Sequence, residues 1–138
     1  MRRTIAGLLT LVVAAFAATF AATCAPPTSP LELAGTYTLM TVNESPLPFA
    51  FPPDGATSVE ALDDQYILTP SGTFTEAGHK RFTLGSAVSI SVPIDAGTFT
   101  RRGDTVTLES PIFGTRTGTI RHGSLTLVLG TFALVYMK

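Results

Sequence analysis

The strongest constraint on the fold is an alternation of apolar and polar residues that runs from about residue 34 onward. The clearest example is VSISVPI, residues 88–94, where four apolar residues share one face: Val88, Ile90, Val92 and Ile94. DTVTLES and GSLTLVLG repeat this period of two, and no segment after residue 24 sustains a period of 3.6. Alternation of this kind is typical of strands that bury one face. The pattern predicts an all-β domain.

Turn residues divide the alternating segments into short units. The chain has 12 Gly and 10 Pro, and TPSGT, RRGDT and RHGS each place Gly near the tip of a hairpin. We predict about nine strands in an antiparallel meander that closes into a small up-and-down barrel or forms a sandwich. The expected ranges are 35–43, 64–69, 72–77, 80–84, 87–94, 97–102, 105–110, 115–121 with 124–129 as a hairpin, and 132–137. A short helical turn is expected around 59–62.

The N-terminus has the layout of a helical secretory signal. Arg2 and Arg3 precede an apolar stretch from Leu8 to Phe20, and small residues follow it. A membrane-spanning anchor is the alternative, because the uncharged run from Ile5 to Thr23 has 19 residues and a spanning helix needs about 20. The run begins almost at the first residue and no basic stop follows it, which favours a signal.

The single cysteine, Cys24, follows this leader directly. The stretch Ala21-Ala22-Thr23-Cys24 resembles the lipobox of bacterial lipoprotein precursors, in which the cysteine thiol takes a diacylglyceryl group. Ala22 and Cys24 match that pattern, whereas Ala21 replaces Leu and Thr23 replaces Gly or Ala. A single cysteine cannot pair within its own chain, and lipid attachment would consume its thiol. An ordinary cleaved signal and an uncleaved anchor remain the alternatives.

This resemblance implies a domain organisation and a location. We expect a signal peptide at 1–23, a lipidated Cys24 with a proline-rich tether at 24–33, and a β-barrel domain at 34–138. Ala25 is not the Asp that marks inner-membrane retention in the lipoprotein family. We therefore expect an exported protein of the bacterial cell envelope that is anchored to the outer membrane, faces the periplasm and is a monomer.

Charge is distributed unevenly along the chain. From Ala25 to His79 there are seven acids and no Lys or Arg, whereas from Lys80 onward seven bases face three acids. Two interpretations follow: the halves neutralise each other in one barrel, which we favour, or the surface is polarised with an anionic rim. No dense basic cluster with interleaved aromatics is present, so nucleic acid is not an expected partner.

Residues that could support chemistry are sparse. His79 and His122 lie beside Gly at expected turns, 43 residues apart, and this is not the spacing of a metal site. Asp63 and Asp64 are adjacent, so in a strand they would face opposite ways. Arg102-Gly103-Asp104 and Asn43-Glu44-Ser45 are interpreted as turns. We expect no enzyme activity, no metal and no cofactor.

The body of the chain resembles the small bacterial lipocalin-like lipoproteins, which are calycin-type up-and-down barrels of unassigned ligand. LAGTYTLMTVNESPLP and the following meander carry this similarity over most of residues 33–138. The family's Gly-x-Trp signature corresponds to Gly35-Thr36-Tyr37. The family's closing-strand arginine packs on that tryptophan, and the nearest base here is Lys138.

The resemblance suggests a small apolar ligand inside the barrel. In lipocalins the loop after the first strand covers the barrel mouth, and here SPLPFAFPPDG carries Phe49 and Phe51. The candidate lining residues are Tyr37, Phe49, Phe51, Phe74, Phe99 and Tyr136. The alternative is a structural or interaction domain without a cavity, because a barrel this small is readily filled by its own side chains. The last strands are apolar on both faces, and we expect an early segment of the chain to cover them.

Overall fold

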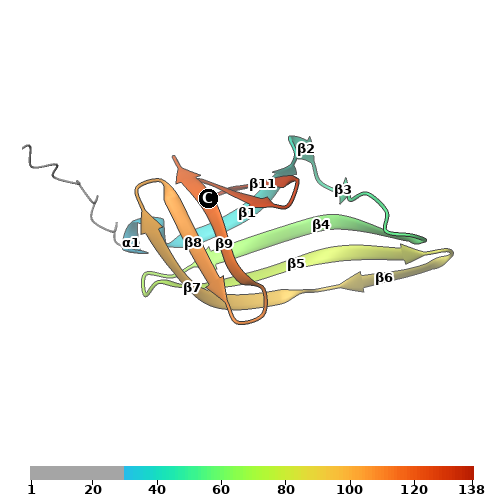
Figure 1. The fold of residues 1–138 in the computed structure, drawn as a ribbon, viewed down its shortest axis with the longest axis horizontal. Helices are drawn as coiled ribbons and strands as arrows, with labels where there is room; N and C mark the ends of the chain where they lie inside the picture. Colours follow the sequence, from blue (N-terminus) through green and yellow to red (C-terminus); the bar gives the residue numbers. More distant parts are fainter. Residues whose placement is uncertain (1–29) are drawn as a thin grey trace, which may run out of the picture.

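The computed structural model describes residues 30–138, which form one short helix and eleven strands (Figure 1). The expected signal peptide, Cys24 and the tether up to residue 29 lie outside the described residues. The elements are α1 (Pro30–Leu33), β1 (Gly35–Val42), β2 (Ser45–Pro46), β3 (Phe49–Ala50), β4 (Thr57–Leu68), β5 (Thr73–Leu84), β6 (Ala87–Ser91), β7 (Ile94–Arg102), β8 (Thr105–Ser110), β9 (Gly114–Arg121), β10 (Ser124–Leu129) and β11 (Phe132–Met137). Within residues 30–138, no helix is long and apolar enough to cross a bilayer.

Eight of the strands form a closed antiparallel barrel. They follow one another in the order β1-β11-β10-β9-β8-β7-β5-β4, and β4 returns to pair with β1 through Gly35↔Leu68 to Thr38↔Gln65. Every pairing in the barrel is antiparallel. Consecutive barrel strands are joined by short hairpins except β1 to β4, where β2 and β3 intervene, and β5 to β7, where β6 intervenes. The predicted up-and-down barrel is therefore confirmed, and it is consistent with a calycin-type fold.

The hairpin of β4 and β5 extends beyond the barrel as an arm (Figure 1). Residues 57–61 of β4 pair with residues 80–84 of β5, and β3 and β6 flank them. Three expectations were wrong here. Residues 59–62 are strand rather than a helical turn, 72–77 and 80–84 belong to one strand, and 87–94 is interrupted at Val92-Pro93. Proline lacks the N–H that a ladder requires, so β5 changes its partner from β6 to β7 at this point.

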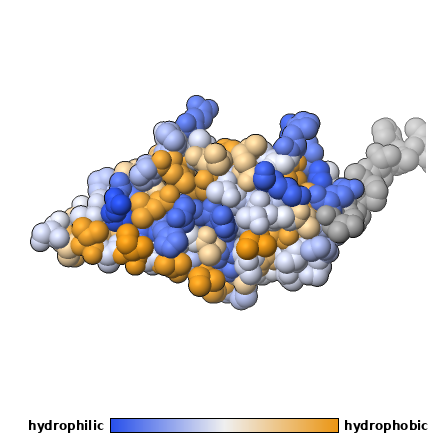
Figure 2. All heavy atoms as spheres, turned by 180° about the vertical axis from the view of Figure 1, so that it is seen from behind, coloured by the Kyte–Doolittle hydropathy of each residue, from blue (hydrophilic) through white to orange (hydrophobic). Residues whose placement is uncertain are grey.

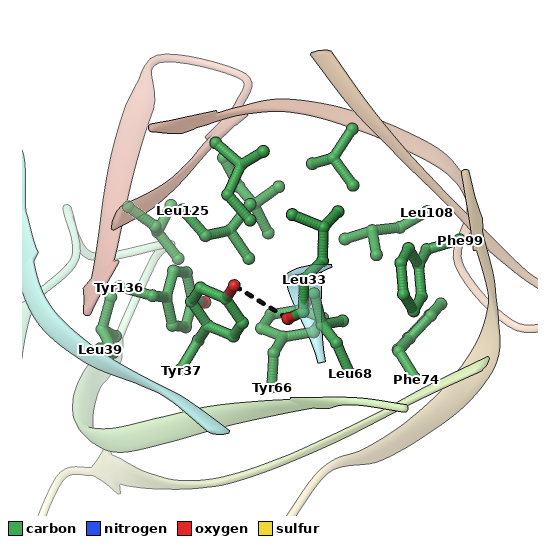
Figure 3. Packing of buried hydrophobic residues seen from close by; sticks show 14 of the residues in the cluster. Leu33, Tyr37, Leu39, Tyr66, Leu68, Phe74, Phe99, Leu108, Leu125 and Tyr136 are labelled. Carbon is green, nitrogen blue, oxygen red and sulfur yellow. Dashed lines mark hydrogen bonds between the residues drawn. The ribbon is translucent and has the colours of Figure 1, made fainter. Parts of the chain in front are cut away.

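The barrel interior is filled by its own side chains (Figure 3). The fully buried members with the largest side chains are Tyr37, Tyr66, Tyr136, Phe74, Leu68, Leu108, Leu125 and Leu127. Helix α1 closes one end, where Leu33 is buried and its carbonyl accepts a 2.9 Å hydrogen bond from the Tyr37 hydroxyl. The Lys138 ammonium lies 6.0 Å from the centre of the Tyr37 ring.

Three glycines let neighbouring strands approach closely. A Cβ on Gly97 would lie 1.9 Å from the Glu109 carbonyl oxygen, and one on Gly118 would lie 2.5 Å from the Thr126 carbonyl oxygen. A Cβ on Gly78 would lie 2.6 Å from the Asp63 carbonyl oxygen. Backbone cannot move aside as a flexible side chain can, so the curvature of the barrel depends on these positions.

The most regular alternating segment of the sequence lies outside the core. Val88, Ile90, Val92 and Ile94 do share a face, but they are 62%, 52%, 50% and 67% exposed. Ile90 pairs with Arg81 and Ile94 pairs with Ala77, both of which are on the outer face of β5. Figure 2 shows the resulting row of hydrophobic side chains along one edge of the arm. We call these four residues the arm stripe.

The outer face of the last two strands is also uncovered. Val128 of β10 and Met137 of β11 are exposed, and no segment within residues 30–138 packs over them. The expectation that an early segment covers this face is not met by the described part of the chain. The inner faces of the same strands contribute Leu125, Leu127 and Tyr136 to the core.

The substitution Gly97→Ala tests the close approach of β7 and β8. We expect a loss of about 3 kcal/mol or more of unfolding free energy, because the new methyl group would overlap backbone that must shift. Urea unfolding followed by circular dichroism measures this. Ala96→Ser, at the neighbouring exposed position, is the control and should change the stability by less than about 0.5 kcal/mol. Equal stability of the two variants would contradict the interpretation.

Candidate functional site at the open end of the barrel

Aromatic side chains gather at the barrel end opposite α1. They are Phe49 of β3, Phe51 in the loop that follows β3, and Phe132 of β11. Their rings meet edge to face, with centres 5.2 Å apart for Phe49 and Phe51, 6.2 Å for Phe49 and Phe132, and 5.0 Å for Phe51 and Phe132. All three rings are partly buried and pack against the main core. The proline-rich loop after β1 therefore does lie over the mouth of the barrel, as the sequence predicted.

Beneath the aromatic cluster, an arginine side chain lies at the centre of a buried network of ion pairs and hydrogen bonds. Arg116 of β9 is only 10% exposed, and its guanidinium pairs with Glu76 at 2.6 Å and with Asp95, which is 1% exposed. The hydroxyl of Tyr66 donates a 2.6 Å hydrogen bond to Glu76 and accepts one from Arg116. The hydroxyl of Ser110 donates to Asp95 at 2.6 Å. A buried charge is tolerated only with partners of this kind, so the network fixes these strands relative to each other.

The guanidinium also lies among three aromatic rings. Its central carbon is 5.6 Å from the centres of Tyr66 and Phe74 and 5.7 Å from the centre of Phe113. Contacts of this kind favour a cation in a partly desolvated place. Arg116 therefore remains charged at the floor of the open end.

Asp64 is a third inward carboxylate, and it lies beside the network that contains Glu76 and Asp95. It accepts a 2.7 Å hydrogen bond from the Tyr136 hydroxyl and one from the backbone N–H of Gln65. Burial raises the pKa of Asp64 to about 6, and the charge of Glu76 contributes to the rise, although the bond from Tyr136 opposes it. Burial also raises the pKa of Tyr136 and of Tyr66, so both remain protonated donors.

Two adjoining hollows open at this end. One of about 170 Å³ lies below Phe51 and Phe132, between Leu39, Leu134 and Asp64. The other, of about 260 Å³, is walled by Ile94, Phe113 and Arg116. Glu76, Lys80 and Leu129 line both, so the two hollows meet at these residues. We call this pair of hollows, with its lining residues, the mouth site.

Two hydrogen-bond donors of residues that line the mouth site have no partner among the described residues. The Nε–H of Arg116 is buried and has no hydrogen-bond partner within residues 30–138. Lys80 faces the mouth site and makes no ion pair with any described acid. An unpaired buried donor costs free energy, which an acceptor atom of a bound molecule would recover. Apolar walls with a few convergent polar groups are typical of small-molecule sites.

The structure separates the six candidate lining residues into two groups. Phe49 and Phe51 lie at the mouth, and Phe51 lines the smaller hollow. The other four are packed in the filled interior, each 3% exposed or less: Tyr37, Phe74, Phe99 and Tyr136 (Figure 3). Whether any of the six contacts a ligand remains a prediction.

Sequence reasoning missed the ionisable residues of the mouth site. Glu76 and Lys80 occupy the same face of β5 as Phe74, and Arg116 precedes Gly118 and Ile120 on the inner face of β9. These residues could have been found from the sequence, because each is a charged residue at a position where the alternation places an inward side chain.

The remaining candidate motifs have structural roles. His79 is not a turn residue, because it lies within β5, and its Nδ1 is 2.8 Å from Asp63. Asp63 faces outward and Asp64 inward, as predicted. Asn43, Glu44 and His122 have positive φ angles at turns, and Gly103-Asp104 forms a hairpin tip. Among residues 30–138, no three His, Cys, Asp or Glu side chains are grouped to hold a metal ion.

Comparisons of the chain with protein-family models, with curated proteins and with solved structures found no match.

The raised pKa of Asp64 predicts a specific dependence of stability on pH. Its folded pKa of about 6 exceeds the unfolded value near 3.8, so the folded state holds the proton more tightly. The stabilisation from this group is fully present below about pH 4 and is lost as the pH rises through 6. Relative to Asp64→Asn, the protein should lose about 2–3 kcal/mol of unfolding free energy between pH 4 and pH 7.

Urea unfolding of both proteins at several pH values measures this difference. Glu109→Gln is the control, because that carboxylate is exposed and forms no ion pair among the described residues. A constant difference between Asp64→Asn and the unsubstituted protein across this range would contradict a buried, readily protonated Asp64.

Proposed function

We propose that this protein is a lipid-anchored barrel domain of the bacterial cell envelope that binds a small amphipathic molecule at the mouth site. The observation that carries the binding proposal is a pair of unpartnered donors, the buried Arg116 Nε–H and the Lys80 ammonium, on residues that line hollows with apolar walls. Such a molecule would place its apolar body against Phe51, Phe132 and Phe113 and direct an acceptor group, such as a carboxylate, toward the two donors.

The filled interior limits the size of this ligand. The core side chains leave the hollows at the open end, and those measure about 170 and 260 Å³. Pockets for drug-sized ligands span about 300–1,000 Å³, so each hollow alone suits a smaller molecule. The proposal is therefore a shallow site at the mouth rather than a deep calyx that holds a long lipid.

The envelope location is supported by the sequence. The leader has a basic start, an apolar middle and a small-residue end, and Cys24 follows it in a lipobox-like context. Helix α1 begins at Pro30. Two further prolines, Pro26 and Pro27, lie between Cys24 and this residue. This spacing suits a short, semi-rigid tether between a membrane anchor and a barrel.

A second candidate function is an interaction domain without a ligand. The observation that favours it is the arm stripe, which exposes four apolar side chains in a row from β6 to the start of β7. Exposed apolar patches often mark protein interaction sites. In this interpretation the polar network only stabilises the barrel, and the mouth site stays empty.

Binding of the probe 1-anilinonaphthalene-8-sulfonate, which joins apolar rings to an anionic group, tests the first candidate. We expect saturable fluorescence enhancement with one site per chain, and Lys80→Met should weaken binding about tenfold because it removes a charged donor. Arg81→Met is the matched control, because Arg81 is the next residue, carries the same charge and faces away from the mouth site. It should change the affinity less than about twofold.

An equal loss of binding in both variants, or no saturable binding at all, would contradict the mouth site and favour the interaction domain. Native mass spectrometry of the protein purified from its own host provides a second measurement. A co-purified small molecule that is lost in Lys80→Met supports the proposal.

Intact mass of the protein extracted from membranes tests the anchor. We expect a chain that begins at Cys24 and carries the mass of three acyl chains with a glyceryl group. Cys24→Ser should abolish the acyl mass and leave the protein unprocessed or soluble, since the thiol is the attachment point. An unlipidated chain that begins at another residue would exclude the anchor.

A further inference from the structure

The two ends of the barrel differ in charge. The α1 end is formed by α1, the β4–β5, β7–β8 and β9–β10 hairpin tips and the end of β11. Its charged residues are four bases and two acids: Arg101, Arg102, Arg121, Lys138, Glu32 and Asp104. The rest of residues 30–138 carries three bases and eight acids. The α1 end therefore has a net charge of +2 in a domain whose remainder is at −5, with histidine neutral.

The basic side chains at this end surround a hollow and are only partly neutralised. A hollow of about 230 Å³ has one acid, Glu32, in its lining, and its other polar or charged side chains include Arg101, Arg121, His122 and Lys138. Arg121 pairs with Asp104 at 2.6 Å, whereas Arg101 is 3.9 Å from both Glu32 and Asp104. Arg102 is exposed, and neither it nor Lys138 pairs with an acid side chain among the described residues. These groups can donate to phosphate oxygens without breaking a buried interaction.

The tether enters the barrel at this same end. Pro30, which begins α1, follows Cys24 by six residues, so a fully extended tether reaches about 20 Å. An anchored barrel would thus be held within about two Debye lengths of the membrane surface at physiological salt. The short reach of the tether brings the α1 end, and not the arm, closest to the lipid.

We propose that the α1 end docks on anionic phospholipid head groups, with Arg101, Arg102, Arg121 and Lys138 as the contacting bases. This inference rests on the proposed lipid anchor for the orientation of the barrel. Each base near an anionic surface is attracted to it, and several bases together orient the barrel, because the anchor already holds the domain at the membrane. The acidic remainder of the domain is repelled from the same surface.

Tryptophan fluorescence gives a direct test, because the chain has no Trp. Thr105→Trp places a probe on an exposed position beside the β7–β8 hairpin tip, and Ser86→Trp places one at the far tip of the arm. The full lipidated protein is reconstituted into vesicles of brominated phosphatidylcholine, with or without phosphatidylglycerol. We expect quenching of the Thr105→Trp probe only when phosphatidylglycerol is present, reversal by salt, and little quenching of the Ser86→Trp probe.

Charge variants then identify the contacting groups. Arg102→Gln with Arg121→Gln, in the Thr105→Trp background, should shift the equilibrium between docked and free barrel about tenfold or more toward the free form. Lys80→Gln with Arg81→Gln removes the same number of charges from the other part of the domain and should leave the quenching unchanged. Equal quenching with and without phosphatidylglycerol, equal loss in both double variants, or stronger quenching of the arm probe would overturn the proposal.

Failure of the anchor is distinguishable from failure of docking. Intact mass shows whether Cys24 is lipidated, and the quenching measurement can be made with unlipidated protein added to the same vesicles. If intact mass shows an unlipidated chain and the added protein still shows phosphatidylglycerol-dependent quenching, the anchor is rejected and the docking surface is retained. Lipidated protein whose Thr105→Trp probe is not quenched would retain the anchor and reject the docking surface.

Discussion

Hydrogen bonding between β1 and β4 converts an open meander into a closed barrel, because β1 already pairs with β11 along its other edge. Closure fixes the diameter of the interior and removes the free edges that a sheet of this length would otherwise expose. The interior must then be filled at the density of a packed core, which three tyrosines, two phenylalanines and several leucines achieve. Gly97 and Gly118 allow the strands to bend around this filling.

The same closure explains why charges are found inside the open end. Helix α1 and Leu33 seal one end with apolar contacts, whereas the other end has only partly buried aromatic rings over it. Inward positions near that end can bear ionisable groups, provided that each one finds partners across the barrel. Arg116 of β9 is the partner of two such groups, because it pairs with both Glu76 of β5 and Asp95 of β7. The mouth site is the space that remains between this ionic floor and the aromatic rings.

The fold class, the meander and most strand positions were predictable from the sequence, because alternation and turn residues are local signals. The extent of β4 was not, since GATSVEALDDQY contains Ala, Leu and Glu that suit a helix, and only pairing with β5 makes it strand. Alternation in residues 88–94 indicated a strand with two distinct faces but not which face is buried. That depends on the register with β5, which is not encoded within the segment. The ion pairs of Arg116 likewise join β9 to β5 and β7, far apart in the sequence.

The uneven distribution of acids and bases along the chain gives the two ends of the folded barrel different net charges. The first half supplies the arm and the loops of the open end with acids, and the second half supplies the hairpin tips at the α1 end with bases. We expected the two halves to neutralise each other, and Arg116 and Arg81 do pair with acids of the first half. At the α1 end, Arg101 reaches only one acid of the first half, Glu32 at 3.9 Å, and Arg102, Arg121 and Lys138 form no ion pair with the first-half acids among residues 30–138. If this end faces the membrane, the mouth site faces away from it, where a soluble ligand can enter unhindered by the bilayer.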